Sequence, residues 1–294
     1  MNIVQTKKAH KVICSFIVLM EATFQSSNSD VNPRAIQSSN PLRDFRTERR
    51  AVHSLHYSFE GHSKNETEIS IPAKGITSID SNIKRLVKLK ELNLGGNKLR
   101  SLPAEIRELK SLQKLDLNCN KFETFLEVIG ELENLLELNL NFNKLKTLPS
   151  EMGKLKNLQV LILNDNKLER LPPGIGRLKN LLYLYLKGNK LKTPPPEMGK
   201  LKNLRELNLN NNQLETLPVE VGNLNLQELY LNGNKLETLP IEIKKLSGSL
   251  EILDLRGNNI LEEGDGKRTL GKKELRKIFE DRVVFDGDAL RIPQ

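Results

Sequence analysis

The stretch Asn157–Asn180, NLQVLILNDNKLERLPPGIGRLKN, contains one complete unit of a pattern that recurs along most of the chain. Its marker is Asn166, and an asparagine returns at the same place in the pattern every 22 to 24 residues. The other markers are Asn97, Asn120, Asn143, Asn189, Asn212, Asn234 and Asn258. A single unit of this length cannot cover its own leucines, so the units must stack and bury a shared core.

The spacing within the unit predicts a coil with a strand on one side and a compact turn on the other. Leu161 and Leu163 lie two residues apart and face the core, which leaves Val160 and Ile162 on the opposite face of the strand. The amide of Asn166 offers donor and acceptor atoms to the backbone where the strand ends. The prolines that follow fix φ and remove backbone donors, so the return segment is too short and too interrupted for a long helix.

A degenerate unit precedes the eight marked ones. Lys74 stands at its marker position, but its apolar residues match those of the next unit one for one. Ile69, Ile71, Ile76, Ile79, Ile83, Leu86 and Leu89 correspond to Leu92, Leu94, Leu99, Leu102, Ile106, Leu109 and Leu112. The repeats therefore cover residues 67–262, and a terminal unit of this kind is expected where the stack meets a cap.

The pattern L-x-x-L-x-L-x-x-N-x-L, continued by LPxEIGxLKNL, resembles the leucine-rich repeat. It is similar to the 23-residue class of intracellular Ras-binding scaffolds and their plant intracellular relatives. The resemblance implies an α/β solenoid, a curved horseshoe capped at both ends. About nine parallel strands should line its concave face, and short helical or 3-10 segments should form its convex face.

Four segments outside the repeats complete the predicted organisation. Residues 1–22 place lysines before a short apolar run and are typical of a secretory signal peptide, the alternative being an unstructured or amphipathic N-terminus. Residues 23–40 should form a disordered linker, and residues 41–66 a helical N-terminal cap. Residues 263–294 should form a C-terminal cap, with Thr269 as the N-cap of its helix. This closing run is similar to the C-terminal cap of leucine-rich-repeat families in microsporidian parasites.

Residue content argues against catalysis and against metal or cofactor binding. All four histidines lie outside the repeats, no glycine-rich phosphate loop follows a strand, and no paired carboxylates stand apart from the repeating rows. Two cysteines, Cys14 and Cys119, are too few for a disulfide-clamped cap or a cysteine metal site. We therefore expect a non-catalytic protein with no metal and no cofactor. The secretory pathway is favoured as its location, with the cytoplasm as the alternative.

The outward positions of the strands predict the binding surface. Six, four and two residues before each marker, the repeats supply six acidic and three basic residues, although the whole chain has a formal charge of +9. In the middle of this acidic face, two neighbouring strands present apolar and aromatic side chains, which we expect to form one exposed patch. The predicted partner-binding residues are Val160, Ile162, Tyr183, Tyr185, Tyr230, Glu137, Glu206 and Glu228.

The predicted partner is a protein or peptide with a basic and an apolar segment. Nucleic acid should avoid the acidic face, no transmembrane span is expected, and the oligomeric state is left open. The alternative function is binding of an anion or a membrane surface through the lysines that follow the markers. This row comprises Lys98, Lys121, Lys144, Lys167, Lys190 and Lys235.

The first prediction concerns the N-terminus. If Val12–Met20 is the apolar core of a signal peptide, protein purified from its native source should begin near Thr23. Mass spectrometry of the intact protein checks this, and a retained Met1 would contradict it.

Overall fold

The computed structural model describes residues 54–288, which belong to one compact unit within residues 52–294. The predicted signal peptide, the predicted linker and the first part of the predicted N-terminal cap lie outside the described residues. The last six residues of the chain, 289–294, lie outside them as well.

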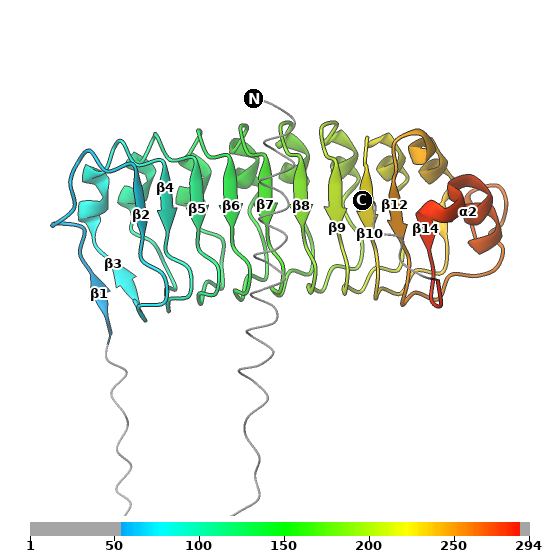
Figure 1. The fold of residues 1–294 in the computed structure, drawn as a ribbon, viewed down its shortest axis with the longest axis horizontal. Helices are drawn as coiled ribbons and strands as arrows, with labels where there is room; N and C mark the ends of the chain where they lie inside the picture. The colour runs from blue at the N-terminus through cyan, green and yellow to red at the C-terminus, as the bar shows by residue number, and fades with distance from the viewer. Residues whose placement is uncertain (1–53, 289–294) are drawn as a thin grey trace, which may run out of the picture. The chain divides into compact units, whose positions relative to one another are not determined.

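The described residues form a curved solenoid whose main element is a parallel sheet of ten strands (Figure 1). Nine strands come from the repeats, as predicted, and the tenth comes from the C-terminal cap. Equivalent residues pair along the sheet, so Leu138 lies beside Leu161 and Leu161 beside Leu184. In chain order the strands are β2 (Glu68–Ser70), β4 (Glu91–Asn93), β5 (Lys114–Asp116), β6 (Glu137–Asn139), β7 (Val160–Ile162), β8 (Tyr183–Tyr185), β9 (Glu206–Asn208), β10 (Glu228–Tyr230), β12 (Ile252–Asp254) and β14 (Val283–Val284).

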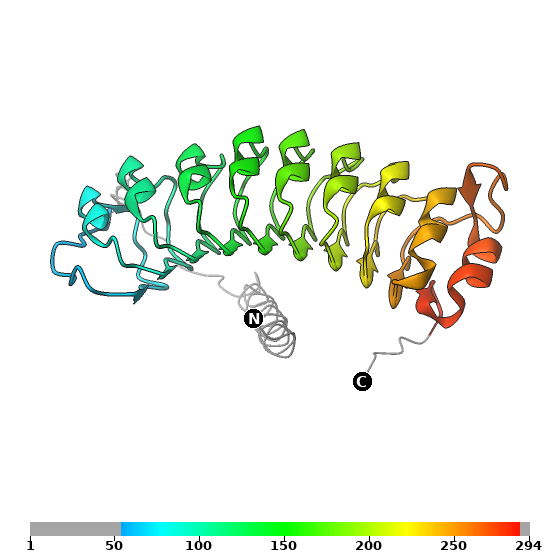
Figure 2. The ribbon, with the colours of Figure 1, turned by 90° about the horizontal axis from the view of Figure 1, so that it is seen from above.

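Short 3-10 helices form the opposite, convex side, and Figure 2 shows them outside the row of strands. Most of them start directly after a proline in extended backbone, such as Pro172 with φ −73° and ψ 152°. These two observations confirm the predicted leucine-rich-repeat horseshoe. The helices are η1 (Ser81–Arg85), η2 (Ala104–Glu108), η3 (Glu127–Glu131), η4 (Ser150–Lys154), η5 (Pro173–Arg177), η6 (Pro196–Lys200), η7 (Val219–Asn223) and η8 (Ile241–Gly248).

The core consists of leucines from the strands and from the convex segments, and the marker asparagines run beside it. Asn166 is buried and its Nδ2 donates to the carbonyl oxygens of Leu140 and Leu163 at 2.9 and 3.1 Å. Its Oδ1 accepts from the Leu145 N–H at 3.0 Å, which ties its coil to the preceding one. The same bonds recur at the other markers, so the asparagine column is structural.

The N-terminal cap differs from the prediction, because residues 54–66 contain no helix. Instead, β1 (His56–Tyr57) pairs in parallel with β3 (Ser78–Ile79) of the first coil, where β1 covers backbone groups of that edge. Asp80 then accepts a hydrogen bond from the Ser58 hydroxyl at 2.6 Å and another from the Phe59 N–H at 3.1 Å. Phe59 is fully buried and closes this end of the core, so a helix is not needed to cover it.

The C-terminal cap contains the predicted helix, with a different start. α2 spans Lys272–Phe279 and its N-cap is Gly271, whose N–H donates to the Glu274 carboxylate at 2.8 Å. The prediction of Thr269 as N-cap is wrong, because Thr269 lies in β13 (Thr269–Leu270). This strand pairs antiparallel with β11 (Leu239–Pro240). The α2 side chain of Phe279 is fully buried against the core, and after η9 (Glu280–Arg282) the chain adds β14 to the sheet.

Stability of the convex side should depend on a column of glycines between neighbouring 3-10 helices. A Cβ added at Gly153 would lie 2.6 Å from the carbonyl oxygen of Gly174, whereas a Cβ at Gly130, one coil earlier, would meet its nearest atom at 3.2 Å. Gly153→Ala should therefore lower the free energy of unfolding by about 1–3 kcal/mol, because a backbone atom must move. Gly130→Ala is the matched control and should change it by less than about 1 kcal/mol. Urea unfolding measures both, and equal losses would contradict the packing described.

Candidate functional site

The polar clusters of residues 54–288 include no candidate metal site. Within this range no group of three or more His, Cys, Asp or Glu side chains is arranged to hold a metal ion. One hydrogen-bonded chain joins Tyr57 Oη to His62 Nε2 and His62 Nδ1 to Glu66 Oε2, each at 2.8 Å. The bond to His62 lowers the pKa of Glu66, whose other oxygen accepts from the Ser63 N–H. This hydrogen-bonded network fixes the turn that brings Phe59 onto the core. The described helices are all too short or too polar to cross a bilayer.

The concave face contains the outward side chains of the strands, and much of its charge is paired between neighbours. Lys114 on β5 lies 3.2 Å from Glu91 and 3.9 Å from Glu137, on the strands that flank it. Near the other end of the sheet, Arg256 donates two hydrogen bonds to Asp254, at 2.8 and 2.7 Å. The acidic surplus predicted for this face is thus concentrated away from these two clusters.

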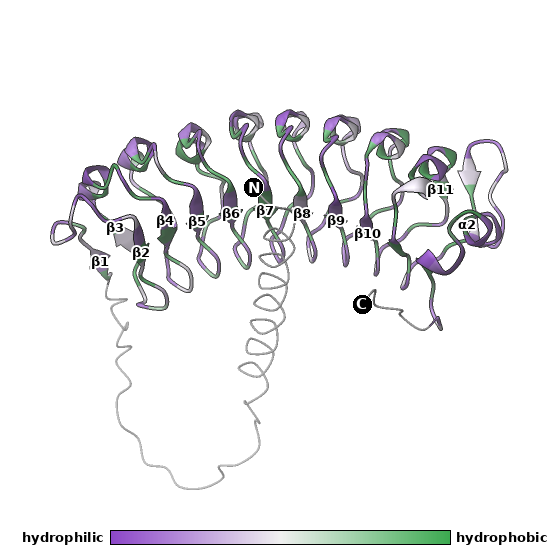
Figure 3. Cartoon of the chain, turned by 45° about the horizontal axis from the view of Figure 1, so that its top comes forward, coloured by the Kyte–Doolittle hydropathy of each residue, from purple (hydrophilic) through white to green (hydrophobic). Residues whose placement is uncertain are grey.

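Between the charged clusters, the structure brings the predicted apolar residues together. Val160 pairs with Tyr183 and Ile162 with Tyr185, so the four residues occupy adjacent positions on β7 and β8. They lie on the face opposite Leu161, outside the leucine core. Colours at both ends of the hydropathy scale appear in each coil, as this alternation requires (Figure 3).

The expectation that this patch is exposed is wrong for three of its four residues. Val160, Ile162 and Tyr185 are 8%, 6% and 3% exposed, and Tyr183 is half-buried. The apolar group is therefore largely buried, and Tyr183 is its most accessible member.

Glu206, Glu228 and Tyr230 adjoin this group on the C-terminal side. Tyr185 Oη donates to Glu206 at 3.1 Å, and Tyr230 Oη donates to Glu228 at 2.6 Å. Burial, and then the neighbouring charge of Glu228, raise the pKa of Glu206 to about 8, against the opposing effect of the Tyr185 hydroxyl. Glu206 therefore carries a proton in most molecules at neutral pH, and the face is less acidic than the sequence indicates.

Glu137 bounds the apolar group on the other side. It pairs with Val160 across β6 and β7 and is half-buried. Burial raises the pKa of Glu137, and the cation of Lys114 acts in the opposite direction. The predicted residues thus lie on five consecutive strands, β6 to β10, with carboxyl groups on both sides of the aromatic centre.

Sequence reasoning missed Phe142, which lies at the edge of this face. It directly precedes a marker asparagine, where each coil turns with positive φ, and its own φ is 50°. Glycine, asparagine and aspartate adopt this conformation readily, but for other residues it costs roughly 1–2 kcal/mol. The sequence did contain a signal for Phe142, because it is the one bulky residue among those that directly precede the markers. These residues are Gly96, Cys119, Phe142, Asp165, Gly188, Asn211, Gly233 and Gly257.

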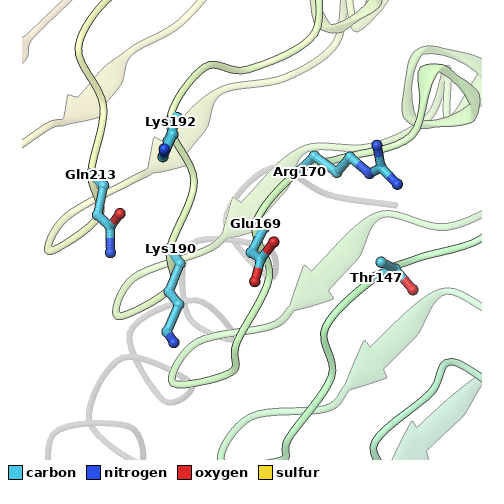
Figure 4. A pocket seen from close by; sticks show the side chains of 6 residues that line it. All are labelled: Thr147, Glu169, Arg170, Lys190, Lys192 and Gln213. Carbon is cyan, nitrogen blue, oxygen red and sulfur yellow. The ribbon is translucent and has the colours of Figure 1, made fainter.

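The lysines of the alternative function come directly after the marker asparagines in the sequence. Most of these lysines are exposed, and Lys190 lines a shallow depression that spans neighbouring coils (Figure 4). Its cationic groups extend in different directions and Glu169 lies among them, so they do not converge on one point. The depression is lined by Thr147, Glu169, Arg170, Lys190, Lys192 and Gln213.

Comparisons with known families agree on the class of fold. The family model described as leucine-rich repeat region matches residues 124–225. Two further leucine-rich repeat models match residues 87–130 and 225–246. None of the curated proteins matches the chain.

Solved structures from bacteria and plants are similar to this chain. A leucine-rich repeat protein of Leptospira interrogans is 40% identical over 76% of this chain and 55% of its own, with a TM-score of 0.70. The plant peptide hormone receptor RGFR1 in complex with RGF2 is 29% identical over 70% of this chain and 38% of its own, with a TM-score of 0.56.

A third structure is the ectodomain of the plant membrane receptor kinase GASSHO1/SCHENGEN3 from Arabidopsis thaliana, in complex with CASPARIAN STRIP INTEGRITY FACTOR 2. It is 30% identical over 74% of this chain and 29% of its own, with a TM-score of 0.57. The chain thus spans about half the length of the bacterial protein and less of the receptors.

The raised pKa of Glu206 predicts a pH dependence of stability. Between the ordinary value of 4.5 and about 8, the folded protein holds a proton that the unfolded chain releases. This group therefore lowers the free energy of unfolding as pH rises through that window, by at most about 1.4 kcal/mol per pH unit. Glu206→Gln should flatten the dependence in urea unfolding between pH 5 and 8.

Glu228→Gln provides the second arm of this experiment. Removal of the neighbouring charge should lower the pKa of Glu206, so the pH-dependent window should close at a lower pH. Parallel pH curves for the wild type and Glu206→Gln would contradict the assignment.

Proposed function

The chain is a leucine-rich repeat protein, and from that premise we propose that it is a non-catalytic module that binds a protein or peptide on its concave face. Proteins of this fold class serve generally as interaction modules. The observation that carries the proposal is the change in side-chain type on β7 and β8. The outward positions of their neighbours β6 and β9 hold only Glu and Asn, whereas these two strands hold Val160, Ile162, Tyr183 and Tyr185.

Folding alone does not account for this group. The leucine core is complete on the other face of the sheet, and none of the four residues belongs to it. Tyrosines beside apolar side chains and inside a polar rim are the common composition of a binding hot spot. Glu137 on one side and Glu228 on the other provide that rim, and both are half-buried.

The chemistry of the rim defines the partner. Carboxyl groups on both sides favour basic side chains, and the centre favours an apolar one. We therefore propose a partner segment with a central apolar residue between basic residues, bound through Tyr183, Tyr230, Glu137 and Glu228. Val160, Ile162, Tyr185 and Glu206, being buried, form the floor that holds these side chains in position.

Related structures support both the partner class and the compartment. The two plant receptors are solved with RGF2 and with CASPARIAN STRIP INTEGRITY FACTOR 2, and one of them is an ectodomain of a membrane receptor. Together with the basic and apolar character of residues 1–22, they support a protein of the secretory pathway. Location in the cytoplasm is the alternative.

Substitution of Tyr183 tests the site with a partner purified from the native source. Tyr183→Ala should weaken binding by about 2 kcal/mol or more, because it removes the accessible aromatic side chain of the group. Glu228→Lys should weaken binding as well, because it reverses a charge on the rim. Titration calorimetry measures both affinities, and thermal unfolding verifies that Tyr183→Ala remains folded.

The control variant comes from the lysine row. Lys167→Ala should leave the affinity unchanged, and the affinity should fall only modestly between 50 and 200 mM salt. A loss with Lys167→Ala, a steep salt dependence and full binding by Tyr183→Ala would reject the concave site in favour of anion binding.

A further inference from the structure

The turn before each marker asparagine imposes one backbone conformation on every coil. The residue in this place has positive φ in all nine repeats, from 50° at Cys119 and Phe142 to 69° at Gly96. Most coils accommodate it with glycine, asparagine or aspartate, and two of the remainder use the small residues Ala73 and Cys119. Phe142 is the single bulky residue in this column of the described coils.

Burial in the core does not explain Phe142. The core contains the phenylalanines Phe59, Phe122 and Phe279, all at most 1% exposed, whereas Phe142 is half-buried and outside the core. A strained conformation persists only when something compensates for it, and such residues concentrate at binding and active sites. Here the strain belongs to an aromatic residue that is half-buried at the edge of the concave face.

Backbone hydrogen bonds place Phe142 beside the apolar group. The Leu140 N–H donates to the Ile162 carbonyl at 2.8 Å, and two residues later the Phe142 N–H donates to the Asn164 carbonyl at 3.0 Å. Asn141 and Asn164 are both buried, and the Asn141 Oδ1 accepts from the Asn164 N–H at 2.7 Å. These bonds fix the turn next to β7, so Phe142 has a defined position at the edge of the concave face.

We propose that Phe142 is a partner-contact residue that extends the concave site to its edge and receives an apolar side chain of the bound peptide. This inference rests on the proposed function. The site then runs diagonally, from the carboxyl group of Glu228 on β10, across Ile162 and Tyr185, to Phe142. Four strand spacings and five residues along the coil separate Glu228 from Phe142, which is about 25 Å. An extended peptide covers this distance in about eight residues.

The partner is therefore a peptide segment with a basic residue and an aromatic or aliphatic residue about eight positions apart. The basic residue contacts Glu228, and the apolar residue contacts Phe142. Charge complementarity supports the first contact, and the exposed part of an aromatic ring supports the second.

The test uses the full chain and a phage-displayed library of random 12-residue peptides as the probe. Selected peptides are synthesised and their affinities measured by titration calorimetry for the wild type, Phe142→Gly, Cys119→Gly and Tyr183→Ala. Phe142→Gly should bind at least tenfold more weakly, and its thermal unfolding midpoint should equal or exceed that of the wild type because the strain is relieved. Cys119→Gly relieves the same backbone strain one coil earlier, and it should keep the wild-type affinity.

Different outcomes overturn different parts of the inference. Unchanged binding by Phe142→Gly, with weaker binding by Tyr183→Ala, would reject the role of Phe142 and leave the concave site standing. A lower unfolding midpoint for Phe142→Gly would assign Phe142 to the fold and reject the proposal. A library that yields no binder, or binders that both variants retain, would reject the proposed function together with this extension.

Discussion

The rest of the structure depends on the buried amide of the marker asparagines. Each coil must turn away from its strand, and that turn leaves backbone groups that the strand ladder no longer pairs. The Asn166 amide satisfies carbonyl groups of its own coil and of the preceding one, and it accepts from the Leu145 N–H. Because every such amide spans two coils, stacking is a condition for satisfying the turns, as well as for burying leucines.

This construction separates the requirements of folding from those of binding. Alternate strand residues point to the leucine core and to the concave surface, so Tyr183 and Leu184 are neighbours with different roles. Outward residues can change between coils with little effect on the core. Glu206 and Phe142 are the places where this separation is incomplete, since each combines a position outside the leucine core with a cost to the folded state.

Part of the positive charge of the chain, formally +9 in all, has a structural use on the convex side. Several convex lysines donate to carbonyl oxygens at the ends of neighbouring convex segments, as Lys179 does to Lys200 O and Lys202 to Asn223 O, at 3.0 and 2.7 Å. These bonds satisfy carbonyl groups that a 3-10 helix leaves open at its end. These lysines therefore belong to the convex scaffold, while acids and aromatic residues outnumber bases at the outward strand positions of the concave face.

The sequence by itself determined the repeat, the parallel sheet, the leucine core and the adjacency of Val160, Ile162, Tyr183 and Tyr185. All of these follow from a fixed period and from the alternation of side chains along a strand, which are local rules. The burial of Tyr185, the protonated Glu206 and the strained turn at Phe142 were decided only by the tertiary structure. So were the strand β1 in place of a helix and the start of α2 at Lys272. Each of these depends on which groups from other coils surround a residue, because solvent exposure, pKa and edge pairing are properties of that environment and not of sequence spacing.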